Sequence, residues 1–117
     1  MSLDKINSEI RRDIATQDFQ TDESLALLTD QGILWYRGLI ESDEGYEKIS
    51  EEELDLVLNS FDCETIVVGH TPVDSVSEDF HGKVIRLDVD HYKNSSALLI
   101  ENNKKYVVDT KGNRTEL

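Results

Sequence analysis

The side chains best suited to chemistry gather around one short stretch, Glu64 to Pro72. It contains four consecutive β-branched residues, Thr65 to Val68, which are typical of a strand covered on both faces. Gly69 follows, and because it has no Cβ it lets the backbone turn or approach another group closely. His70 comes where the strand ends, a position from which side chains usually reach ligands. His70 is therefore a candidate site residue, and the alternative that stays open is a histidine capped by backbone groups at a strand end.

A second candidate lies in the aromatic segment Gly32 to Gly38, which holds the only tryptophan of the chain. Arg37 carries planar pairs of N–H groups that fit a phosphate or another oxyanion. The segment by itself favours a plainer interpretation, with Trp35 as a core anchor and Arg37 as a surface charge. Both interpretations of Arg37 stay open at this point.

Other titratable groups are weaker candidates. His81 lies in a predicted turn, where we expect it to be solvated. His91 follows Asp88-Val89-Asp90, and it either adds an imidazole near the site or only shapes a loop. The acidic run from 41 to 47 is most simply a solvated loop, because its spacing lacks the alternating oxygen ligands of a calcium loop.

Three helices are predicted before the central strand. Apolar residues at spacings of three and four place Leu3, Ile6, Ile10 and Ile14 on one helical face. Asp22 or Thr21 is expected to cap a second, short helix that Gly32 ends. Ser50 and Glu53 form a capping box at the start of a third helix. Its apolar face is formed by Leu54, Val57, Leu58 and Phe61.

Strands are predicted in the second half of the chain. Besides the central strand, they cover 83–89, 96–101 and 104–109, with Asn102-Asn103 as a two-residue hairpin turn. The predicted fold class is α+β, with N-terminal helices followed by a mixed or antiparallel sheet. Residues 1–117 are expected to form a single domain, helical over about 3–61 and sheet-forming over about 64–109.

Composition narrows the classes of partner. The chain has 117 residues and a formal net charge of −13, which disfavours nucleic acid and anionic membranes as partners. It has one cysteine, Cys63, so no intrachain disulfide is possible and a reducing, cytoplasmic compartment is expected. No apolar run is long enough to span a bilayer.

Taken in order, the segments resemble the C-terminal half of calcineurin-like metallophosphoesterases. The closest likeness is to PPP-type Ser/Thr phosphatases of the Shewanella-like bacterial branch. The resemblance is carried by Gly32 to Gly38, Val68 to Pro72 (V-G-H-T-P) and Gly82 to Asp88. It implies a dinuclear centre of two divalent metal ions (manganese, iron or zinc) with His70 as one ligand. It also implies that Arg37 contacts phosphate and that Thr71 helps to set the loop behind the metal ligand.

The resemblance is incomplete, because the D-x-H, G-D-x-x-D-R-G and G-N-H-E motifs of that family do not occur here. One histidine cannot hold a dinuclear centre. It therefore implies the C-terminal portion of a metal-dependent phosphoesterase that hydrolyses phosphate monoesters, inactive and metal-free by itself. The implied partners are a phosphorylated substrate and the missing N-terminal half.

Two alternatives stay open. One is a non-catalytic phosphatase-like interaction or oligomerisation module, because exposed sheet edges and apolar surface favour a homodimer. The other is part of a dinucleoside polyphosphate hydrolase, which uses the same metal chemistry.

Overall fold

The computed structural model describes residues 1–29, 32–40, 47–89 and 95–117. The elements are α1 (Leu3–Thr16), α2 (Asp22–Leu28), α3 (Glu51–Ser60), β1 (Ile66–Val68), β2 (Ser77–Asp79), the 3₁₀ turn η1 (Phe80–Gly82), β3 (Val84–Arg86), β4 (Ser96–Glu101), β5 (Lys104–Asp109) and β6 (Arg114–Glu116). The predicted α+β class, with helices first and a mixed or antiparallel sheet after them, is confirmed. In the described part of the chain, no helix is long and apolar enough to cross a membrane.

Each helix begins at a hydroxyl cap, and the sequence analysis predicts a cap for the second and third helices. Ser2 caps α1, and Thr21 rather than Asp22 caps α2. At α3 the predicted capping box is confirmed. The Glu53 amide donates to Ser50 Oγ at 3.2 Å, and the Ser50 amide donates to Glu53 Oε2 at 3.1 Å. Reciprocal bonds of this kind satisfy amides that have no partner within the helix, so the start of α3 is fixed locally.

A buried polar network joins α1 to α2. Asp13 is completely buried on α1, and Arg12 donates to its Oδ1 at 2.7 Å. A hydrogen bond from Ser24 of α2 is the main influence that lowers the pKa of Asp13; burial opposes this shift and Arg12 adds to it. The carboxylate is therefore held ionised where the two helices meet.

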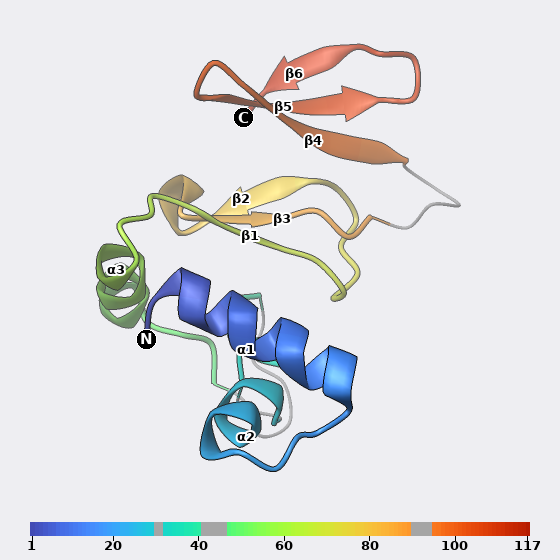
Figure 1. Ribbon diagram of the computed structural model, residues 1–117. Coiled ribbons are helices and arrows are strands. Elements are labelled where there is room, and N and C mark those ends of the chain that lie inside the picture. Colours follow the sequence, from blue (N-terminus) through green and yellow to red (C-terminus); the bar gives the residue numbers. More distant parts are fainter. Residues whose placement is uncertain (30–31, 41–46, 90–94) are drawn as a thin grey trace.

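The strands form two three-stranded sheets. In the first, with order β1-β3-β2, β1 pairs with β3 in parallel and β2 pairs with β3 antiparallel. The second sheet, β4-β5-β6, is antiparallel throughout. Figure 1 shows the first sheet lying between the second sheet on one side and the helices on the other. Strand β1 is at the edge of its sheet, so one side of it has no strand partner among the described residues.

The central strand β3 supplies both hydrophobic clusters, because its side chains alternate between the two faces of the sheet. Val84 packs with Leu54 and Leu58 of α3. Ile85 points the other way and packs with Val76 and Val89, against apolar residues of the second sheet. Helix α3 and the second sheet therefore hold β1 and β3 in position, and the end of β1 carries part of the candidate site.

The strand predictions succeed in outline and miss some details. The predicted turn at Asn102 and Asn103 is confirmed, with φ of 52° and 61°. Strand β3 covers only Val84–Arg86, where the sequence predicts 83–89. Two strands lie outside the predictions: the polar β2, and β6, which extends the sheet beyond residue 109.

Candidate functional site

His70 lies at the carboxyl end of β1 in a tight turn. The Thr71 amide donates to the Gly69 carbonyl at 2.9 Å, and His70 between them has a φ of 69°. This is the geometry of a γ-turn, which is rare and strained for a residue with a side chain. The sequence argument assigned the turn to Gly69. That was wrong, because the positive φ belongs to His70, and a Cβ on Gly69 would meet nothing closer than Leu87 Cδ1 at 3.7 Å.

The aromatic segment approaches this turn. The rings of Trp35 and His70 meet edge to face, with centroids 6.4 Å apart and planes at 81°. Such pairs contribute more than their buried area alone. Trp35 is 50% exposed, so it is not the core anchor of the plainer interpretation. Its place is on the surface beside His70.

The glycines that flank the aromatic segment are required by close contacts. A Cβ on Gly32 would collide with the Leu27 carbonyl oxygen at the end of α2. A Cβ on Gly38 would collide with the phenol of Tyr36, which folds back over it. Burial, with Glu53 nearby, raises the pKa of the Tyr36 phenol. The two glycines thus let the segment curve tightly, and Gly38 leaves room for the Tyr36 ring.

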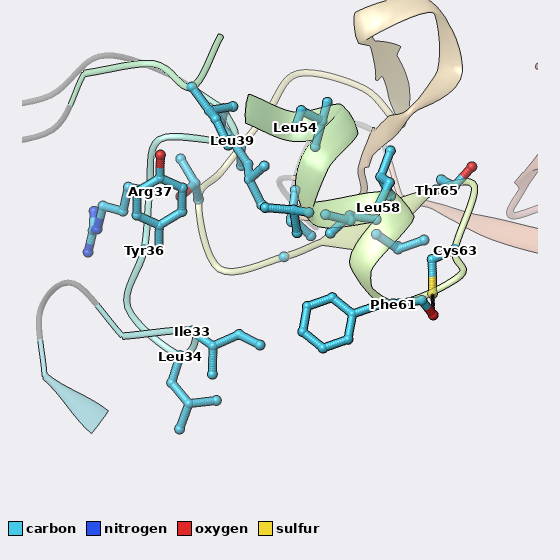
Figure 2. Close-up of a pocket in the computed structure, with 18 of the residues that line it drawn as sticks. Ile33, Leu34, Tyr36, Arg37, Leu39, Leu54, Leu58, Phe61, Cys63 and Thr65 are labelled. Atoms are coloured by element: carbon cyan, nitrogen blue, oxygen red, sulfur yellow. Dashed lines mark hydrogen bonds between the residues drawn. The ribbon is translucent and has the colours of Figure 1, made fainter. Parts of the chain in front are cut away.

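The segment, α3 and β1 enclose a cleft of about 680 Å³, drawn in Figure 2. We call it the apolar cleft, because most of its wall is aliphatic or aromatic. Its apolar lining includes Ile33, Leu34, Leu39, Leu54, Val57, Leu58, Phe61 and Val67. Arg37, His70 and Thr71 line the same cleft. In Figure 2 the Arg37 guanidinium is turned away from Phe61 and Leu58. A cation and an imidazole therefore share a cleft with a mostly hydrocarbon wall.

Exposure separates the three predicted site residues. His70 is exposed, while Arg37 and Thr71 are half-buried. His70 is therefore open to an incoming group, and the two others are held by the cleft wall. Cys63 and Tyr36 also line the cleft, which sequence reasoning missed. The signal for Tyr36 was its place between Trp35 and Arg37; Cys63 carries no comparable signal.

His81, the other histidine that the structure describes, lies outside the apolar cleft. The side chain of His81 is 85% exposed and stands 3.3 Å from Glu51 Oε1, away from the residues that line the cleft. His91 and the acidic residues 41–46 lie outside the described residues. Within 1–29, 32–40, 47–89 and 95–117, no group of three or more His, Cys, Asp or Glu side chains could hold a metal ion.

Three solved structures are similar to the whole chain at 34% sequence identity. They are a cold-active protein tyrosine phosphatase of a psychrophilic Shewanella species (TM-score 0.83), a structure of cold-active protein tyrosine phosphatase at 1.1 Å (TM-score 0.82) and a mutant of such an enzyme (TM-score 0.82). The match covers 100% of this chain but only 35% of each of those chains, so this chain spans about a third of their length. Neither a protein-family model nor a curated protein matches the sequence.

These findings correct the assignment made from sequence motifs. The similar proteins are named tyrosine phosphatases, so the predicted membership of the calcineurin-like metallophosphoesterases is wrong. The predicted function, a C-terminal portion of a dinuclear metal-dependent phosphoesterase, is wrong with it, and so are the two divalent metal ions. The physical reason is that a four-residue G-H-T-P match places one imidazole at a strand end and does not specify the group that the imidazole serves. The roles predicted for His70, Arg37 and Thr71 are not tested by these similarities and stay predictions.

Proposed function

We propose that this chain takes part in removing phosphate from the tyrosine side chains of proteins. The observation that carries the proposal is the match along its whole length, at 34% identity, to proteins named as tyrosine phosphatases. The cleft supports it independently, because Arg37, His70 and Thr71 line it together with a wall suited to an aromatic ring. Since the chain spans about a third of those proteins, the activity is proposed for the protein that these residues belong to.

Arg37 and His70 have separate roles in this proposal. Arg37 binds the phosphoryl oxygens, because a guanidinium fork pairs with two oxygens at once. A water molecule bonds to the phosphorus as the P–O bond to the tyrosine breaks, which releases inorganic phosphate, and His70 donates a proton to the departing phenolate oxygen, a common role of imidazole in catalysis. Trp35 orients the imidazole through its edge-to-face contact. Thr71 holds the γ-turn that presents His70.

The apolar wall gives the proposal its preference for tyrosine. Phe61, Leu34 and Val57 line the cleft, and aromatic rings pack favourably against such surfaces. A phosphoserine side chain has no ring to pack against this wall. We also propose a cytoplasmic location, which the single cysteine supports.

Steady-state hydrolysis of p-nitrophenyl phosphate and of a phosphotyrosine peptide tests this function. We expect His70→Gln and Arg37→Lys each to lower kcat/KM at least about tenfold, the order typical of a lost proton donor or forked phosphate contact. The matched controls are His81→Gln and Arg114→Lys, which alter exposed residues outside the cleft. Equal losses in the controls, or no hydrolysis by the folded wild-type protein, would contradict the proposal.

A further inference from the structure

A second hollow lies next to the apolar cleft. It has a volume of about 440 Å³ and is lined by Pro72, Val73, Asp74, Ser75, Ser77 and Arg86. We call it the Arg86 hollow. Thr71 lines the cleft and Pro72 lines the hollow, so one continuous segment forms a wall of both. Its lining is polar where that of the cleft is hydrocarbon, so the two cavities suit different chemical groups.

Arg86 has a fixed position in this hollow. It is on the central strand β3, directly opposite Ser77 of β2 in the antiparallel register. Directly opposed residues project from the same face of the sheet, with Cβ atoms roughly 4.5–5.5 Å apart. The base of the arginine side chain is therefore held next to the Ser77 hydroxyl by the sheet itself.

The Arg86 guanidinium contains an unused donor. Its Nε is buried and makes no hydrogen bond to any residue that the structure describes. Guanidinium presents five N–H donors and no acceptor, and a buried donor without a partner is unfavourable. Arg86 also has no ion pair within 4.0 Å in the described part of the chain, although acidic residues outnumber basic ones by 25 to 12. The Arg86 side chain thus lines the hollow without a close ion pair to any described residue, and its charge acts on Asp79 only at longer range.

The other groups of the hollow set its selectivity. The Ser77 hydroxyl donates to the Ser75 carbonyl at 3.2 Å, a long bond that an anion can replace. The nearby carboxylate of Asp79 is paired with Lys48 at 2.5 Å, and Arg86 adds a weaker electrostatic attraction to the same carboxylate. Asp74 places a carboxylate in the lining, which disfavours a large anion that fills the hollow. These groups fit a compact tetrahedral anion seated between Arg86 and Ser77.

We propose that the Arg86 hollow is a second anion subsite that takes a phosphoryl group. The assignment of its role rests on the proposed function: a substrate carrying a second phosphoryl group near its phosphotyrosine places that group at Arg86 while the phosphotyrosine occupies the cleft. The shared wall at Thr71 and Pro72 brings the two groups into one substrate-binding surface. The subsite therefore selects doubly phosphorylated peptides.

Binding is tested by NMR with inorganic phosphate as the probe, on ¹⁵N-labelled protein. The Nε–H signal of Arg86 reports directly on the unused donor. We expect it to shift saturably, together with the Ser75 and Ser77 amides. Arg86→Lys keeps the charge but lacks the fork, so it should weaken binding at least tenfold, and Ser77→Ala should weaken it less. The Arg114 Nε–H signal is the control, because that side chain already has an ion pair with Glu101 at 2.9 Å.

Three results of this titration would overturn the subsite. They are the absence of a saturable shift, equal shifts at Arg86 and Arg114, and unchanged phosphate affinity in Arg86→Lys. The backbone spectrum of each variant shows whether it is folded. If Arg86→Lys is not folded, Ser77→Ala and the wild-type Nε–H signal decide the matter.

Selection is tested with peptides that carry one or two phosphates. We expect the wild-type protein to have an at least fivefold lower KM for the doubly phosphorylated peptide, and Arg86→Gln to abolish that difference with kcat unchanged. Equal KM values in the wild type would overturn the selection. His70→Gln separates the two proposals, because it should remove turnover and leave the Arg86 Nε–H shift intact. Loss of turnover in His70→Gln is therefore compatible with the proposed Arg86 subsite.

Discussion

His70 shows how much depends on the backbone of a single residue. It occupies a left-handed conformation that few side chains adopt readily, and it does so at the rim of a cleft. Strain of this kind persists only where the surroundings enforce it. Here the enforcing contacts are the Gly69–Thr71 hydrogen bond and the Trp35 ring. The orientation of the imidazole is therefore set before any ligand arrives.

The strained turn predicts a specific order of stabilities. His70→Asn should be tolerated, because asparagine adopts positive φ more readily than most residues. His70→Val should unfold more easily than His70→Asn by about 1–2 kcal/mol, the approximate cost of the left-handed conformation for an ordinary residue. Urea denaturation followed by circular dichroism measures the difference.

Thr115→Val on β6 is the control for this comparison, because it introduces the same residue type in an ordinary exposed strand. We expect its stability to stay close to that of the wild type. Equal stabilities for His70→Val and His70→Asn would show that the turn carries no strain.

Among the helices and strands, the sequence predicts features that depend on neighbouring residues, such as helix caps. It does not predict which strands pair. The Ser50–Glu53 capping box involves residues three apart, so the sequence alone predicts where α3 begins. Strand β2 (Ser77–Asp79) has no apolar pattern, and it is a strand only because β3 pairs with it. The cleft likewise depends on a tertiary arrangement. The motifs singled out Arg37 and His70, but they could not show that Trp35 stands against the imidazole.

The junction of α1 and α2 predicts a pH effect. The pKa of Asp13 is lowered in the folded state, mainly by Ser24 and also by Arg12, from an ordinary value of 3.8. A lowered pKa stabilises the fold above the unfolded-state value, and this contribution is lost as the pH falls through the folded-state value. The stability advantage of wild type over Asp13→Asn should therefore be full near neutral pH and shrink below about pH 4.

Urea denaturation of both proteins at several pH values measures this advantage. The comparison must be made as a difference, because Glu51, Glu53, Asp79 and Asp109 also have lowered pKa values. An advantage that stays constant down to pH 2 would contradict the assigned role of Asp13.

In the whole molecule, net charge and exposed apolar surface have opposite effects on association between copies of the chain. A net charge of −13 keeps copies apart. Against it, Ile33, Leu34, Trp35 and Val67 are all at least 41% exposed in or beside the apolar cleft, and β1 is an outer strand. The similar proteins are almost three times as long, so they contain chain that has no counterpart here. The free side of β1 favours pairing with another strand, and for this chain we propose that the partner strand is β1 of a second copy.

Sedimentation velocity tests this proposal. We expect a dimer at micromolar concentration that strengthens with added salt, because salt screens the repulsion between acidic surfaces. Val67→Glu on β1 should give a monomer. Ile100→Glu, at a residue that is 57% exposed on β4 and does not line the cleft, should leave the dimer intact. A wild-type monomer at every salt concentration would contradict the proposal.

The short segment through Thr71 and Pro72 has one more consequence. It separates the apolar cleft from the Arg86 hollow, and the Val73 amide anchors it by donating to the carbonyl of Asp88, two residues beyond β3, at 2.7 Å. A shift of this segment into one of the two cavities would make the other cavity larger. Substitutions of Thr71 or Pro72 that make room for a larger aromatic ring in the apolar cleft would therefore also change the shape of the Arg86 hollow. The selectivity of the two cavities would have to be altered together.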